Sequence, residues 1–107
     1  MERVLIIDPD AMHAAELQDG MEAIGYDTTT FPDMRNALGA IKEGCLDLIV
    51  VVPRSSLSLP DALTSVGSAL KDLVRPPEIL FLLRWKPRGP AERLLGDRWS
   101  VQVLYER

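Results

Sequence analysis

LDLIVVV, residues 46–52, is the most apolar segment of this 107-residue chain and the strongest indication of its fold. Residues 48–52 form an unbroken run of large aliphatic side chains, followed directly by Pro53. Such a run is typical of a strand that is buried on both faces, as in a parallel sheet with helices on either side. Because it is the most apolar segment of the sequence, we expect this strand at the centre of the sheet.

A buried strand and a helix are predicted near the N-terminus. RVLII, residues 3–7, is a short apolar run bounded by Asp8 and Pro9. Over residues 10–24 the apolar side chains recur at steps of three and four, which is the period of one helix face. Gly25 is expected to end this helix in the left-handed conformation. The inward positions of the helix are Ala14, Leu17, Met21 and Ile24.

A second strand and helix lead to the central run. YDTTTF, residues 26–31, is rich in β-branched and aromatic side chains and predicts a strand. Pro32 and Asp33 then open a helix that Gly44 closes. The inward positions of this helix are Met34, Ala37, Leu38 and Ile41.

Beyond the central run, residues 55–74 predict a helix that starts near Pro60. ILFLL at 79–83 and SVQVLY at 100–105 predict two more strands, with a short helix near residues 91–95 between them. The inward positions of the longer helix are Leu63, Val66, Leu70 and Leu73.

Strands and helices alternate along the whole chain. This order predicts a single α/β domain over residues 1–107, with a parallel sheet, right-handed crossovers and helices on both faces. The length suits one domain with one core. No helix follows the last strand, so apolar groups of that strand and its neighbours are expected to be exposed unless something covers them.

Composition and charge narrow the class of protein. Hydrophobic residues make up 47% and charged residues 26%, as in soluble globular proteins, and no apolar run is long enough for a membrane span or a signal peptide. We therefore expect a cytoplasmic protein. The net charge of −4 argues against direct nucleic-acid binding. Residues 1–74 carry five basic and twelve acidic side chains, whereas residues 75–107 carry seven basic and four acidic ones.

Cys45 and His13 are the single cysteine and the single histidine of the chain. One cysteine cannot form an internal disulfide, and neither residue has partners spaced for a metal site. We interpret Cys45 as a reduced thiol at a strand entrance and His13 as a solvated helix residue. We expect no metal and no cofactor.

The segments RVLIIDPD, AIGY and DLIVVVP, taken together, resemble the receiver domain of bacterial two-component response regulators. The spacing from Asp8 to Gly25 is similar to that from the family's first acid to the glycine of its Gly-Tyr/Phe signature. The resemblance covers nearly the whole chain. It implies a flavodoxin-like open parallel five-stranded sheet in the order 2-1-3-4-5, without the last helix. It also implies that the chain is an N-terminal fragment of a longer regulator.

The resemblance also shows which reactive residues this chain lacks. Receivers use two neighbouring acids to hold Mg²⁺, an aspartate to accept a phosphoryl group, a hydroxyl residue and a lysine. Here the first acid is Asp8, with Asp10 two residues on, and the remaining roles fall on Pro9, Val52, Leu82 and Leu104. None of these last four side chains carries a carboxylate, hydroxyl or ammonium group. We therefore predict a degenerate site with no catalytic residue, in which the three aliphatic side chains fill the pocket.

The leading hypothesis is a pseudo-receiver, a non-enzymatic signalling and protein-interaction domain of a bacterial regulator, typically a transcriptional one. One alternative is an atypical receiver phosphorylated through Asp8 or Asp10, although these acids are also expected as helix-capping and first-turn residues. Another is a small-molecule-binding flavodoxin-like domain, although no glycine-rich phosphate loop is present. Phosphorylation of the turn serines by another enzyme and DNA binding by the basic end are weaker alternatives.

An interaction surface is predicted near the fourth helix and the fifth strand, where aromatic and basic residues gather. Such residues are enriched at binding hot spots. We expect this surface to bind a protein partner, the output domain of the same chain or a second copy in a homodimer, and no membrane. Its members are Arg84, Trp85, Lys86, Arg88, Arg93, Arg98, Trp99 and Tyr105.

Overall fold

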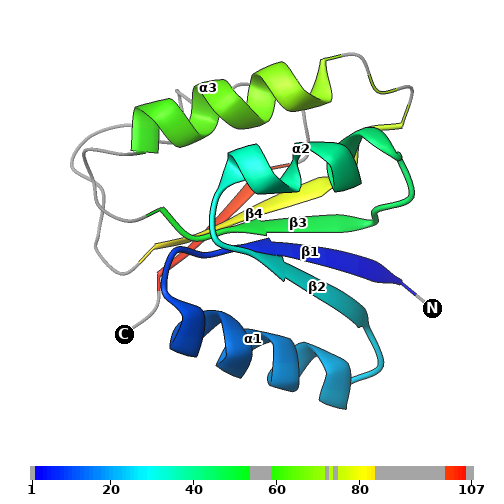
Figure 1. The fold of residues 1–107 in the computed structure, drawn as a ribbon, viewed down its shortest axis with the longest axis vertical. Coiled ribbons are helices and arrows are strands. Elements are labelled where there is room, and N and C mark those ends of the chain that lie inside the picture. The colour runs from blue at the N-terminus through cyan, green and yellow to red at the C-terminus, as the bar shows by residue number, and fades with distance from the viewer. Residues whose placement is uncertain (1, 54–58, 72, 74, 84–100, 106–107) are drawn as a thin grey trace.

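Five parallel strands form one sheet in the order β2-β1-β3-β4-β5 (Figure 1). The computed structural model describes residues 2–53, 59–71, 73, 75–83 and 101–105, and only the backbone course for 59–63, 83 and 101–105. The strand order and the parallel direction confirm the prediction, and the most apolar run lies at the centre of the sheet. The strands are β1 (Arg3–Ile7), β2 (Asp27–Phe31), β3 (Leu48–Val51), β4 (Glu78–Leu83) and β5 (Val101–Tyr105).

Within the described residues, three helices cover the two faces of this sheet (Figure 1). They are α1 (Ala11–Ala23), α2 (Met34–Lys42) and α3 (Leu59–Leu70). α1 packs on one face, here called the α1 face, while α2 and α3 pack on the other, the α2/α3 face. The predicted doubly covered α/β sheet is therefore confirmed. The short helix predicted near residues 91–95 lies outside the described residues.

Local signals in the sequence set the helix ends. Asp10 is extended and caps α1, since its side chain accepts hydrogen bonds from the backbone N–H groups of Met12 and His13. Asp33 caps α2 in the same way through the N–H of Asn36. The connections after these helices contain Gly25 (φ +103°) and Gly44 (φ +74°), as predicted, because an L side chain disfavours that backbone conformation.

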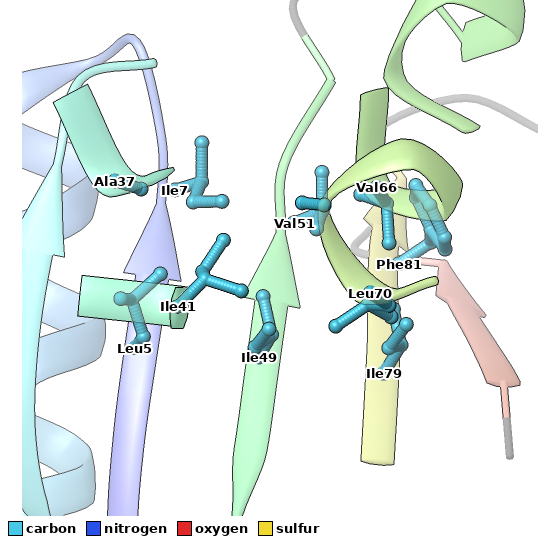
Figure 2. Packing of buried hydrophobic residues seen from close by; sticks show 11 residues of the cluster. Leu5, Ile7, Ala37, Ile41, Ile49, Val51, Val66, Leu70, Ile79 and Phe81 are labelled. Carbon is cyan, nitrogen blue, oxygen red and sulfur yellow. The ribbon is translucent and has the colours of Figure 1, made fainter. Parts of the chain in front are cut away.

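The larger cluster of buried side chains lies on the α2/α3 face (Figure 2). Leu5 and Ile7 of β1 point to this face, because side chains alternate along a strand. The predicted inward positions of α2 and α3 are confirmed where side chains are described, with Leu63 outside that set. The cluster consists of Leu5, Ile7, Ala37, Ile41, Ile49, Val51, Val66, Ala69, Leu70, Ile79 and Phe81, with Met34, Leu38 and Leu73 among the half-buried side chains packed on it.

The cluster on the α1 face is smaller. Its fully buried members are Val4, Ile6, Val50 and Val52. Leu17, Met21, Leu80 and Leu82 pack against it but stay half-buried. The prediction for Ile24 was wrong: it lies at the C-terminal cap of α1, and 73% of its surface is exposed. The cap is where the helical geometry ends, so the three-and-four spacing no longer directs the side chain inward.

No helix among the described residues is long and apolar enough to cross a membrane.

Candidate functional site at the carboxyl ends of the strands

The residues predicted for the degenerate site lie along one edge of the sheet, where the parallel strands end. Asp8 follows β1 and Val52 follows β3. The two strand ends are joined directly, because the Val52 N–H donates to the carbonyl oxygen of Ile7 over 2.8 Å. Leu82 lies near the end of β4, in register with Leu104 of β5. In open parallel sheets this edge is where ligands bind and where chemistry takes place.

Asp8 is buried, with 1% of its side-chain surface exposed. Its backbone N–H donates to the carbonyl oxygen of Phe31 over 2.9 Å, which continues the pairing of β1 with β2. Both carboxylate oxygens also have partners. The Asp10 N–H donates to Oδ1 over 2.9 Å, and the ring nitrogen Nδ1 of His13 is hydrogen-bonded to Oδ2. An ionised carboxylate only accepts, so with Asp8 ionised Nδ1 is the donor of this pair.

His13 is the site residue that sequence reasoning missed. We predicted a solvated helix residue, but only 7% of its side-chain surface is exposed. His13 lies four residues before Leu17, which packs on the α1 face, so the two share one side of the helix. The spacing of His13 from Leu17 was the available signal. An apolar helix period leaves His13 out because histidine is polar. The hydrogen bond to the buried Asp8 carboxylate offsets the cost of removing the polar ring from water.

Asp10 and Pro9 complete the turn between β1 and α1. Asp10 is exposed, and its Oδ1 accepts hydrogen bonds from the N–H groups of Met12 (3.1 Å) and His13 (3.2 Å). The helix-capping interpretation of Asp10 is therefore confirmed. Asp8 does not cap the helix: its carboxylate is hydrogen-bonded to the Asp10 backbone N–H and to the His13 ring. Pro9 is half-buried and supplies neither a carboxylate nor a backbone N–H.

Val52 is buried, with 4% of its surface exposed, in the cluster on the α1 face. Leu82 packs against the same cluster and is half-buried. These two predicted members of the site therefore lie in one apolar environment. For Leu104 the structure gives the register with Leu82 alone. The carboxyl end of β3 thus presents packed aliphatic groups, next to a strand whose end carries a buried carboxylate.

The magnesium ion that the resemblance implies does not fit these residues. Mg²⁺ prefers carboxylate and water oxygens in an octahedral arrangement. Of the implied ligands only Asp8 is an acid, and each of its oxygens already accepts a hydrogen bond from within the same turn. Among the described residues, no three His, Cys, Asp or Glu side chains are grouped so that they could hold a metal ion.

A groove of about 560 Å³ opens at the opposite edge of the sheet, where the strands begin. Glu2, Asp47 and Glu78 line it, with Arg75 as its one basic lining residue among those described. The small-molecule alternative was predicted at the carboxyl ends of the strands, so this groove does not support it. Cys45, which also lines the groove, is exposed just before β3, as predicted for a strand entrance.

The predicted interaction surface lies outside the described residues, apart from the backbone of Tyr105 in β5. Its side chains, from Arg84 to Trp99, therefore remain a prediction from the sequence.

Several solved structures of response regulators share this fold. A response regulator from Thermotoga maritima aligns with a TM-score of 0.80 at 10% identity, covering 99% of this chain and 85% of that one. The response regulator TrrA of the same organism, solved in complex with Mg²⁺-BeF, aligns with a TM-score of 0.74 at 18% identity (100% and 88% covered). TrrA in complex with the histidine kinase ThkA aligns with a TM-score of 0.75 at 19% identity, covering 100% of this chain and 87% of that one.

No protein-family model matches this sequence, and the search of curated proteins found no match. At identities of 10–19% the structural similarity shows the fold. The chain therefore has the fold of response regulator receiver domains, and a shared fold does not by itself establish a shared function.

Proposed function

We propose that this receiver-fold domain is a pseudo-receiver, a signalling and protein-interaction domain that does not use aspartyl phosphate. The observation that carries the proposal is the burial of Val52 at the end of β3, beside an Asp8 whose oxygens are both engaged. On this proposal the three aliphatic residues Val52, Leu82 and Leu104 take the place of the reactive residues of a receiver.

The chemistry of phosphoryl transfer explains why these residues matter. The acceptor must be a carboxylate oxygen that is free to attack, and metal ions or fixed cations must neutralise the charge that develops. Valine offers no nucleophile. A bound phosphoryl group would also bring roughly −1.5 to −2 charges into an apolar cluster, where they would lack partners.

A pseudo-receiver acts through protein contacts. TrrA was solved with the histidine kinase ThkA, so one protein of this fold binds a signalling partner. For this chain we propose a protein partner or an output domain of a longer bacterial regulator, typically a transcriptional one, and a homodimer. The basic and aromatic residues from Arg84 to Tyr105 are proposed as the contact surface, without direct nucleic-acid or membrane binding.

The experiment that tests the proposal is a mass measurement on the intact chain. The purified protein is incubated with Mg²⁺ and a small-molecule phosphodonor, and its mass is compared with that of an untreated sample. We expect an unchanged mass. A gain of one phosphoryl group, mapped to Asp8 or Asp10 by fragmentation, would overturn the proposal and establish the atypical receiver instead.

The interaction part of the proposal has its own test. Sedimentation of the purified chain over a range of concentrations is expected to show a dimer. A monomer at every concentration would contradict the homodimer, and would leave an output domain or another protein as the partner.

A further inference from the structure

In the function proposed above, His13 enters only as the partner that occupies one oxygen of the buried Asp8 carboxylate. Asp8 follows β1, and His13 lies in the first turn of α1. Both are buried, and the imidazole Nδ1 is hydrogen-bonded to the carboxylate Oδ2. The two residues are only five positions apart, so the contact joins the end of β1 to the first turn of α1.

The remaining polar groups of this turn support the same conformation. The Asp10 N–H donates to Asp8 Oδ1, while the Asp10 carboxylate caps α1 and accepts from the N–H of His13. The helix cap thus fixes the backbone that carries the imidazole, and the imidazole in turn binds the carboxylate. Each carboxylate oxygen of Asp8 thus has a hydrogen-bond partner from this chain, Oδ1 the Asp10 N–H and Oδ2 the His13 ring.

We propose that His13 substitutes for the divalent cation at Asp8. Its N–H supplies the donor that the carboxylate needs once the cation is absent, and its ring fills the space beside Oδ2. The turn between β1 and α1 is then held in one conformation whether or not divalent cations are present. This inference rests on the proposed function, because a domain that works without aspartyl phosphate needs a partner-binding surface that does not depend on a metal.

A purely space-filling role for His13 gives different results. If the ring merely packs, then replacing it lowers stability but leaves Asp8 as unresponsive to cations as before. If the N–H substitutes for a cation, then removing it leaves a buried carboxylate without that donor, and a divalent cation can bind there. The response to a cation therefore separates the two roles.

The test compares three variants of the full chain with the wild type. His13→Ala removes the donor. His13→Asn keeps a donor, because its side-chain amide nitrogen is the same number of bonds from Cα as Nδ1. Met12→Ala is the matched control in the same helical turn, since Met12 is 77% exposed. Line broadening of backbone amide signals by Mn²⁺ reports binding residue by residue, and the melting temperature is followed with and without Mg²⁺.

In the wild type and in Met12→Ala, we expect the Asp8 and Asp10 amides to stay sharp at millimolar Mn²⁺, with a melting temperature that does not depend on Mg²⁺. His13→Ala is expected to melt roughly 10 °C lower or more, to recover part of that loss with Mg²⁺, and to show broadened Asp8 and Asp10 signals. His13→Asn is expected to respond to the cation less than His13→Ala. If His13→Ala folds only when Mg²⁺ is added, the proposal is supported equally.

Two results would overturn the proposal: broadening of Asp8 in the wild type, or a His13→Ala variant that responds to cations no more than the wild type. Should His13→Ala fail to fold under all conditions, the wild-type spectrum and the His13→Asn variant still decide. Failure here is distinct from failure of the proposed function. A phosphoryl gain by mass refutes the pseudo-receiver whatever His13 does, whereas cation binding at Asp8 of the wild type without phosphoryl gain refutes the role of His13 alone.

Discussion

The ends of β1 and β3 lie side by side at one edge of the sheet, and they exclude a reactive carboxylate in two different ways. At the end of β1 the carboxylate of Asp8 remains, but it is buried and hydrogen-bonded to the turn that follows it. At the end of β3 the side chain is Val52, which is part of an apolar cluster. The comparison indicates that a polar strand end can be kept in the interior only where local donors satisfy it.

The two ends differ in what a substitution should do. At β3 the surroundings are apolar, so any added charge lacks a partner. At β1 the surroundings are arranged for a charge, so the loss of a partner is the damaging change. Substitutions at the two strand ends and at neighbouring positions test this difference.

Val52→Asp is expected to have the largest effect. It introduces a carboxylate into a cluster formed by Val4, Ile6 and Val50, and an unpaired buried charge costs about 3–5 kcal/mol of unfolding free energy. Urea unfolding measures the loss. The control is Leu82→Asp, whose smaller effect follows from a half-buried position at the edge of the same cluster. Equal losses for the two variants would contradict the burial of Val52.

His13→Ala is expected to lower the free energy of unfolding by about 3 kcal/mol, because it leaves the buried Asp8 carboxylate without one donor. Met12→Ala, at an exposed position in the same turn, should change it by less than about 0.5 kcal/mol.

The double variant His13→Ala with Asp8→Ala sharpens this prediction. Because the two side chains interact, its loss should be smaller than the sum of the single losses by about 1 kcal/mol or more. Additive losses would show that the contact contributes nothing to stability.

Asp10→Ala is expected to cost about 1 kcal/mol, because it removes the side-chain acceptor for the Met12 and His13 N–H groups at the start of α1. Asp10→Ser keeps a capping oxygen and should lose less. Thermal unfolding compares the two variants, and equal losses would show that the cap is not the source of the effect.

Thr28→Val is expected to have the smallest effect, and in the opposite direction. Thr28 lies in β2, and its buried Oγ1 has no hydrogen-bond partner among the described residues. Replacing the hydroxyl by a methyl group should be neutral or should stabilise the fold by up to about 1 kcal/mol. A clear destabilisation in urea would contradict this prediction, because it would show that the Thr28 hydroxyl stabilises the fold.

Much of the fold could be predicted from the sequence, because the apolar pattern changes period at each boundary. The unbroken run at 48–52 indicated the central strand, and Gly25 and Gly44 marked where two helices end. Ile24 was assigned wrongly to the inward face, because the spacing of apolar residues does not show whether position 24 still belongs to the helix or is its C-terminal cap. The aromatic and basic surface beyond β4 stays a prediction.

The site could be predicted only in part. The absence of a carboxylate at Pro9 and at Val52 followed from the resemblance, because a missing functional group can be seen in the sequence. The partnership of Asp8 with His13 could not be predicted in the same way. It depends on the direction in which the capped helix leaves the strand, which brings residue 13 back to residue 8. A polar residue on the apolar side of a helix was the one available signal.

The most direct test of the account is the amide spectrum of the wild-type chain before and after addition of Mg²⁺ and beryllium fluoride. TrrA, which was solved with Mg²⁺-BeF, provides the positive control. We expect the amide signals of Asp8, Asp10 and Val52 not to move, because Val52 carries no carboxylate and each oxygen of the buried Asp8 already has a hydrogen-bond partner within the chain. Shifts confined to these residues and to the end of β4 would contradict it, and would show that the edge of the sheet still binds the phosphoryl analogue.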